Sequence, residues 1–178
     1  MVMTVKTDRY SDGRIRNKYW YLDGQLHRED GPAVMSYDAF GSLNNEVWWN
    51  RGRIHRIGGP AILYYLVDVK RTETWCQDNE KHREDGPAVI SYNDKGRIEI
   101  QEWWIRGDKR RTTHYVGGRM SSDVWKKQNK LHREDGPAVT RDDGHGAYSR
   151  WFLENVEIAE VDFAEELDRY VLRRVMDS

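Results

Sequence analysis

The stretch HREDGPA at residues 27–33 decides the fold, because the chain spells it three more times with little change. Residues 82–88 and 132–138 repeat it letter for letter, and residues 55–61 read HRIGGPA. Each copy has a tryptophan seven residues ahead of its histidine, so the repeating unit is larger than the heptapeptide and keeps a fixed internal geometry. The residues that mark this structural lattice include Trp20, His27, Gly31, His55, Trp75, His82, Gly86, Trp125, His132 and Gly136.

The tryptophan position can be followed beyond the four motif copies. It is occupied by Trp20, Trp48, Trp75, Trp103, Trp125 and Trp151. Four residues after each of these stand Gly24, Gly52, Asn79, Gly107, Asn129 and Asn155. Glycine and asparagine are the residues that tolerate positive φ, so this position is predicted to be the left-handed residue of a tight hairpin turn.

The segments between these turns have the character of β-strands. Residues 97–103 (RIEIQEW) precede one tryptophan, and residues 88–92 (AVISY) follow one motif copy and are rich in β-branched and aromatic side chains. A second turn often follows, as at residues 37–41 and 92–96. We therefore expect a mainly β protein, an elongated antiparallel β-meander of about six repeats and about ten to twelve strands, forming a single domain over residues 1–158.

Two segments depart from the repeat. The fourth unit has four extra residues before the glycine pair at 117–118, which predicts an irregular loop or a kink in the sheet and a short strand before Trp125. After Asn155 the hydrophobic period becomes helical, which predicts a C-terminal capping helix over residues 159–178. Its expected features are an apolar face of Phe163, Leu167, Tyr170 and Val171, a capping pair of Asp162 and Glu165, and Arg173 and Arg174 near its end.

The overall composition excludes some classes of function. The net charge is −1 with 33% charged residues, so no global field attracts the chain to nucleic acid. Cys76 is the only cysteine and excludes an internal disulfide, and no apolar run approaches the roughly 20 residues of a membrane span. We expect a soluble protein of a reducing cytoplasm, the host's cytoplasm if the protein is viral, with no membrane partner.

A motif with histidine, arginine, glutamate and aspartate in succession invites a metal or catalytic interpretation, which sheet geometry disfavours. Equivalent residues of neighbouring repeats lie two strands apart, about 10 Å, whereas a zinc ligand lies about 2 Å from its ion. His27 and His55 therefore cannot share a metal ion. No segment resembles a nucleophile with its base, a phosphate loop or a carboxylate pair, so we expect no metal, no cofactor and no enzymatic activity.

A structural role explains the motif more simply. Gly31 would supply backbone freedom, Pro32 would start the next strand, and Asp30 would close the turn through side-chain to backbone bonds. Arg28 and Glu29, with their counterparts, would form a charged ladder between repeats.

Function is expected where the repeats disagree. The second copy places Ile57 and Gly58 where the others have glutamate and aspartate, which leaves Arg56 without acidic neighbours. In the two WWxRG segments, Trp49 and Trp104 should project from the face opposite to Trp48 and Trp103. Tryptophan and arginine are typical interface anchors. The predicted partner-binding residues are therefore Trp49, Arg51, Trp104, Arg106, Arg110 and Arg111, unless the helix or a loop covers the rings.

A basic patch offers an alternative function. The cations that follow the fourth tryptophan could hold a nucleotide or a single-stranded nucleic acid, with Lys109, Arg119, Lys126, Lys127 and Lys130 as binding residues beside Arg106, Arg110 and Arg111. The simpler interpretation of the same residues is a solvated face whose charge is balanced by the acidic C-terminal segment.

The segment YWYLDGQLH at residues 19–27, followed by a glycine and a second strand, resembles the MORN repeat. The chain is also similar to MORN-variant proteins of the YwqK antitoxin type, and its HREDGPA spelling resembles proteins of phages and large DNA viruses. The resemblance covers residues 14–155 and implies a non-enzymatic scaffold that recognises a protein. The implied partner is a toxin or a host defence component, which the protein would inhibit or sequester. Pairing of open sheet edges into a homo-oligomer is a further expectation.

Overall fold

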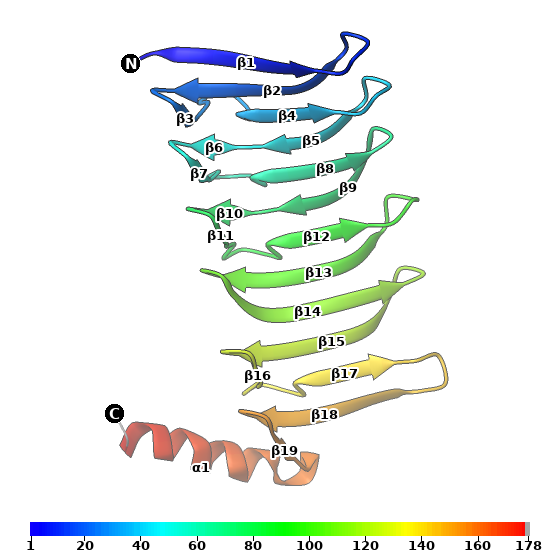
Figure 1. Cartoon of the computed structure of the whole chain (residues 1–178). Coiled ribbons are helices and arrows are strands. Elements are labelled where there is room, and N and C mark those ends of the chain that lie inside the picture. Colours follow the sequence, from blue (N-terminus) through cyan, green and yellow to red (C-terminus); the bar gives the residue numbers. More distant parts are fainter. Residues whose placement is uncertain (177–178) are drawn as a thin grey trace. The chain divides into compact units, whose positions relative to one another are not determined.

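The computed structural model describes residues 1–176, which form two compact units, Met1–Gly107 and Asp108 onward. The expectation of a mainly β protein with antiparallel strands and a C-terminal helix is confirmed (Figure 1). Nineteen strands, one 3₁₀-helix and one α-helix make up the described part of the chain, and six of the strands are only two residues long. The structure has more strands than the roughly ten to twelve that the sequence predicted, mainly because these two-residue strands were not predicted.

The first unit is an antiparallel meander. In sheet order its strands are β1 (Met3–Arg9), β2 (Ile15–Leu22), β4 (Val34–Tyr37), β5 (Leu43–Val47), β8 (Ile62–Leu66), β9 (Val69–Thr74), β12 (Val89–Tyr92) and β13 (Ile98–Ile105). Short strands precede the motif copies: β3 (Gln25–Leu26), β6 (Trp49–Asn50), β7 (Arg53–Ile54), β10 (Cys76–Gln77) and β11 (Glu80–Lys81). Figure 1 shows these short hairpins one after another along the same ends of the longer strands.

The turns predicted from glycine and asparagine are confirmed at all six positions. Gly24, Gly52, Asn79, Gly107, Asn129 and Asn155 have φ between 63° and 82°. The residue before each also has positive φ, between 45° and 50°: Asp23, Arg51, Asp78, Arg106, Gln128 and Glu154. Two consecutive left-handed residues define the type I′ turn, whose twist matches that of the two strands it joins.

The second unit contains β14 (Asp108–Val116), β15 (Arg119–Lys127), β16 (Lys130–Leu131), β17 (Val139–Asp142), β18 (Ala147–Leu153) and β19 (Val156–Ile158). The prediction of a shortened strand before Trp125 is wrong, because β14 and β15 are both nine residues long. In place of an irregular loop, the hairpin has one register shift, between His114 and Tyr115. Gly117 and Gly118, with φ of 61° and 84°, join them in a tight turn. Without a motif loop to form, the extra residues lengthen a hairpin whose Thr112–Val116 segment favours extended backbone.

The predicted terminal helix is present as η1 (Glu160–Asp162) followed by α1 (Phe163–Met176), and residues 177–178 of the predicted range lie outside the described residues. Tyr170 contacts the last hairpin: its hydroxyl donates to Glu154 at 2.9 Å, and its ring centre lies 5.4 Å from that of His132. Two details were wrong, because Val171 is 44% exposed and Asp162 belongs to the 3₁₀ turn instead of capping the helix with its side chain. The described helix is too short and too polar to cross a membrane.

The motif alanines form the centre of each repeat. Ala33, Ala61, Ala88 and Ala138 are fully buried, and their carbonyls accept the backbone N–H of the tryptophan in the same repeat. In the second unit Ala138 packs with Val139 and Phe152 in a small core. A fully buried alanine leaves no room for a larger side chain, which explains why this motif position does not vary between the four copies.

Candidate functional site

The arginine of each motif copy is clamped onto the tryptophan eight residues before it. In the first copy the guanidinium of Arg28 lies 4.4 Å from the ring centre of Trp20, and its Nε donates to Asp30 at 2.8 Å. One Nη also points to the carbonyl of Pro32 at 3.5 Å. The same clamp forms around Arg83 and Arg133, with ring distances of 4.1 and 4.2 Å. The constant spacing of eight residues between tryptophan and arginine is the sequence signal for this contact, which was not predicted.

The clamp corrects the predicted roles of glycine and aspartate. Gly31 does not have positive φ, and a Cβ built on it would lie 2.9 Å from Cζ of Arg28, so glycine is needed to make space for the guanidinium. Asp30 has that guanidinium as its main partner instead of a turn amide, and the hydrogen bond from Arg28 lowers the pKa of the Asp30 carboxyl.

The motif histidine joins one repeat to the next. Nδ1 of His27 accepts the backbone N–H of Arg51, the first left-handed residue of the following turn, at 3.3 Å. His55, His82 and His132 make the same bond at 3.2 to 3.3 Å. A neutral imidazole that accepts at Nδ1 carries its proton on Nε2, so Nε2–H is a donor in every copy.

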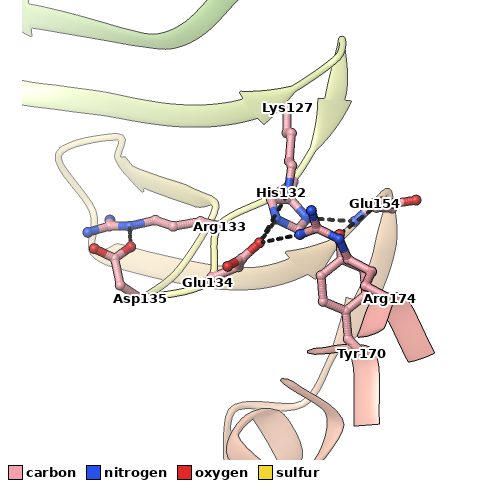
Figure 2. A network of polar contacts seen from close by, with 8 residues as sticks. All are labelled: Lys127, His132, Arg133, Glu134, Asp135, Glu154, Tyr170 and Arg174. Atoms are coloured by element: carbon pink, nitrogen blue, oxygen red, sulfur yellow. Dashed lines mark hydrogen bonds and ion pairs between the residues drawn. The ribbon is translucent and has the colours of Figure 1, made fainter. Parts of the chain in front are cut away.

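In the three complete copies this donor faces the glutamate of the same motif. The distances from Nε2 to the glutamate oxygen are 3.7 Å for His27–Glu29, 3.6 Å for His82–Glu84 and 3.0 Å for His132–Glu134. Figure 2 shows the last of these pairs beside the Arg133–Asp135 pair. The predicted charged ladder of arginine and glutamate between repeats is therefore wrong, because the arginine of each complete copy pairs with the aspartate of that copy and the glutamate faces the histidine of that copy.

The second copy keeps the basic half of this arrangement and lacks the acidic half. Arg56 lies 4.0 Å from the ring centre of Trp48 and donates to the carbonyl of Pro60 at 3.0 Å, but no carboxylate within residues 1–176 pairs with it. Ile57 and Gly58 stand in place of the glutamate and aspartate. The side chain of His55 is 20% exposed, against 8%, 9% and 5% for the other three motif histidines.

Two neighbouring depressions of the first unit meet at Arg56, and we call them together the motif groove. The first encloses about 670 Å³ and is lined by residues 27–32, Trp48–Asn50 and residues 55–57. The second encloses about 450 Å³ and is lined by Arg56, Gly58, Trp75, Gln77 and residues 82–85. The groove thus follows three consecutive motif copies, with indole rings and guanidinium groups along it.

The structure separates the predicted partner-binding residues. Trp49 lines the groove together with Trp48. The chain leaves the strand ladder at Trp48, so the period-two argument for opposite faces does not apply to this pair. Nε1 of Trp49 is buried and has no acceptor within residues 1–176. Trp104 instead donates from Nε1 to Glu102 at 2.9 Å and carries the ammonium of Lys81 over its ring at 4.5 Å. It is not among the residues that line the groove.

The predicted arginines occupy two kinds of position. Arg51 and Arg106 are exposed turn residues whose backbone N–H groups bond to His27 and His82. Arg110 and Arg111 belong to β14 in the second unit, where Arg110 pairs with Asp108 at 3.1 Å and Arg111 with Asp123 at 2.7 Å.

Most cations of the basic patch also have partners. Within the second unit, Lys127 pairs with Glu134 at 3.1 Å, Lys130 pairs with Glu154 at 3.3 Å, and Lys126 donates to Asn129 at 3.3 Å. Arg119 is exposed at the start of β15. A depression of about 160 Å³ remains, lined by Lys109, Arg111, Thr112, Val124, Lys126 and Asn129.

The cysteine, one tyrosine with a shifted pKa and the possible metal ligands give no sign of a reactive centre within residues 1–176. Burial raises the pKa of the Cys76 thiol, which favours its protonated, unreactive form. Burial, and then the hydrogen bond to Glu46, raise the pKa of Tyr65 to about 12. Within residues 1–176, no group of three or more histidine, cysteine, aspartate or glutamate side chains is arranged to hold a metal ion.

Comparisons with protein-family models, with curated proteins and with solved structures find no match to this chain. Interpretation of the site therefore depends on its own geometry. The described geometry comprises an aromatic and arginine-lined groove over three repeats, one unpaired guanidinium within it, and a separate small basic depression in the second unit.

Proposed function

We propose that the protein is a non-enzymatic binding module of MORN-like repeats whose motif groove binds an extended segment of a partner protein. The observation that carries this proposal is that the two depressions together are lined by three consecutive motif copies and share Arg56. Binding in this groove would block or sequester the partner.

The groove has the chemistry of a protein interface. Tryptophan and arginine contribute most binding energy in such interfaces, because they bury a large area and still form directed polar contacts. Here the guanidinium groups are already held against indole rings, so little side-chain entropy is lost when a partner binds.

The identity of the partner is proposed from the resemblance of residues 14–155 to MORN-variant proteins. In that setting the partner is a toxin or a host defence component in the cytoplasm, and the protein acts as its inhibitor. A scaffold of nearly identical hairpins suits this role, because the backbone lattice stays constant while single groove residues change.

A selection experiment tests the proposal. A library of random peptides displayed on phage is selected on the full-length protein, and enriched peptides are then measured against the Trp49→Ala variant. We expect enriched peptides that lose about tenfold or more in affinity for this variant, a typical loss for an interface tryptophan. The Trp104→Ala variant is the matched control and should retain them. Failure to enrich any peptide, or equal binding to both variants, would contradict the proposal.

A second candidate function, nucleotide or nucleic-acid binding, is favoured by the depression around Lys109, Arg111 and Lys126. The ion pairs of the neighbouring cations reduce its positive potential. Titration of a fluorescent single-stranded oligonucleotide at increasing salt separates the two candidates: phosphate binding should weaken steeply with salt and depend on Lys126, whereas peptide binding through the groove should depend on Trp49.

A further inference from the structure

The motif groove carries an alternating pattern of charge. The first copy contains one cation and two carboxylates, Arg28 against Glu29 and Asp30, and the third copy repeats this balance. The second copy contains Arg56 and no carboxylate. With neutral histidines, the formal charges along the groove are therefore −1, +1 and −1.

The acidic side chains of the outer copies are accessible to a partner. Their side chains are 82% to 90% exposed: Glu29, Asp30, Glu84 and Asp85. Although Asp30 and Asp85 each bond to an arginine through one oxygen, exposed pairs of this kind contribute little stability and can accept further donors.

The middle copy presents donors without acceptors. In the complete copies the aspartate bonds to Nε of the arginine at 2.7 to 2.8 Å. At Arg56, Nε of the guanidinium has no carboxylate partner within residues 1–176. The space beside Gly58 is open, because a Cβ built on this residue would meet no atom within 4 Å. Nδ1 of His55 accepts the backbone N–H of Asp78 at 3.3 Å, with the Asp78 carboxylate 3.5 Å from the same atom. An imidazole that accepts at Nδ1 donates from Nε2, so Nε2–H of His55 is a second donor, and the Ile57 side chain cannot accept from it.

We propose that Arg56 binds the carboxylate of an acidic residue in the partner segment, at the guanidinium edge that the motif's own aspartate takes in the complete copies, and that His55 offers the donor that the glutamate meets there. This inference rests on the proposed function and names the chemistry of its partner. The guanidinium is suited to the task, because its planar donors match a carboxylate and it is already fixed against Trp48 and Pro60.

The neighbouring copies define the rest of the partner segment. Adjacent copies are two strands apart in the sheet, about 10 Å. A chain in the polyproline II conformation advances about 3.1 Å per residue with three residues per turn, so side chains three positions apart lie on the same side of it. A segment that crosses the strands with its acidic residue at Arg56 therefore places residues three positions before and after it beside the outer carboxylates. Lysine or arginine at those two positions complements the charge, so the segment has the pattern basic, two residues, acidic, two residues, basic.

A heptapeptide of this pattern is the probe, Lys-Ser-Val-Glu-Val-Ser-Lys with blocked ends, titrated into the ¹⁵N-labelled full-length protein. We expect backbone amide shifts at residues 55–59 and a Kd that rises about tenfold or more when the central glutamate is replaced by glutamine. The Arg56→Gln variant should show the same loss. Arg133→Gln is the matched control, because it removes the same clamp outside the groove, and it should bind the peptide as the wild type does.

A second variant tests the site without removing Arg56. The double substitution Ile57→Glu with Gly58→Asp restores the HREDGPA sequence and supplies the missing carboxylates within the chain. We expect it to lose peptide binding about as fully as Arg56→Gln. Gly58 has φ of 76°, so aspartate there costs about 1 kcal/mol, which thermal unfolding of the same variant measures separately.

The outcomes distinguish this inference from the proposed function. Absence of peptide binding at millimolar concentration, equal affinity for the glutamate and glutamine peptides, or full binding by Arg56→Gln would overturn the acidic-residue assignment. Shifts at residues 55–59 caused by inorganic phosphate and not by the peptide would overturn it in favour of a phosphate ligand. In each case, phage-selected peptides that depend on Trp49 would still support a protein-binding groove.

Discussion

At the scale of single residues, the motif is a set of mutually dependent contacts. The arginine lies on tryptophan, the glycine leaves space for its guanidinium, and the aspartate pairs with its Nε. The histidine bonds to the next repeat, and the alanine closes the interior. Each letter of HREDGPA thus has a physical partner, and most of these partners are within the same copy or in the adjacent turn.

Substitution of Gly86 should weaken the clamp. A Cβ there would lie 3.0 Å from Cζ of Arg83, so the guanidinium must leave its position over Trp75, and the free energy of unfolding should fall by about 1 kcal/mol. Urea denaturation of Gly86→Ala measures this. Gly146→Ala is the control, since a Cβ built on Gly146 would meet no atom within 4 Å and its φ is not positive. A Gly86→Ala loss no larger than that of the control would contradict the packing role.

The Arg83–Asp85 pair should make stability depend on acid pH. Its hydrogen bond lowers the pKa of Asp85 below the unfolded value of about 3.9. The folded state therefore gains stability above that value and loses it as the pH falls through the lower folded pKa. Urea denaturation at pH 7 and at decreasing pH below 4 should show the difference between wild type and Asp85→Asn shrinking as the solution becomes more acidic. A constant difference would show that the charge of Asp85 is not the cause.

At the scale of elements, four of the six type I′ turns are hydrogen-bonded to a preceding short strand. The backbone N–H of Gly52, Asn79, Gly107 and Asn155 donates to a carbonyl of the preceding short strand. Asn79 and Asn155 add a second bond, because their side-chain oxygens accept the N–H of Ile54 and Leu131 at 2.8 and 2.7 Å. Asn79 and Asn155 therefore serve two purposes: each adopts the left-handed backbone of the turn, and each accepts a hydrogen bond from the preceding repeat. The sequence pattern predicted only the first of these.

Two substitutions of Asn79 separate these purposes. Asn79→Gly keeps the left-handed backbone and loses the bond to Ile54, so the free energy of unfolding should fall by about 1 kcal/mol. Asn79→Ala also strains the backbone and should lose about 1 kcal/mol more. Thermal or urea unfolding gives the order wild type, glycine, alanine. If the alanine variant equals the glycine variant, the left-handed requirement is not limiting.

At the scale of the whole molecule, the repeats form two compact units that end differently. The first begins with β1, whose Val5 is 60% exposed on an edge strand. The second ends in α1, which contacts its last hairpin through Tyr170, with Arg174 beside Glu134 at 3.6 Å (Figure 2). Repeat arrays require such terminal elements, because an end repeat has a neighbour on one side only.

Removal of the Tyr170 side chain should loosen the second unit and leave the first unit unchanged. Tyr170→Ala loses the hydrogen bond to Glu154 and the ring contact with His132, so amides of residues 130–158 should exchange faster with deuterium. Hydrogen exchange followed by mass spectrometry measures both units in one sample, with residues 15–92 as the internal control. Faster exchange in both ranges would show that the helix stabilises more than its own hairpin.

Local patterns account for what the sequence determined by itself. Glycine and asparagine located the six turns, β-branched and aromatic runs located the long strands, and a change of period located α1, because each of these depends on the φ and ψ preferences of a few adjacent residues. The wrong prediction for the fourth unit has the same origin: the lost motif suggested an irregular loop, whereas Thr112–Val116 had strand preference of its own.

Only the tertiary structure decided which side chains meet. The stacking of Arg56 on Trp48, the bond from Arg56 to the carbonyl of Pro60 and the position of Trp49 beside the groove depend on how each motif loop returns across its own hairpin and beside the next one. Spacing along the chain does not specify that path, because contacts between loops arise from the packing of whole repeats. The sequence therefore determined a lattice of turns and strands, and the packing of its loops decided where that lattice can hold a partner.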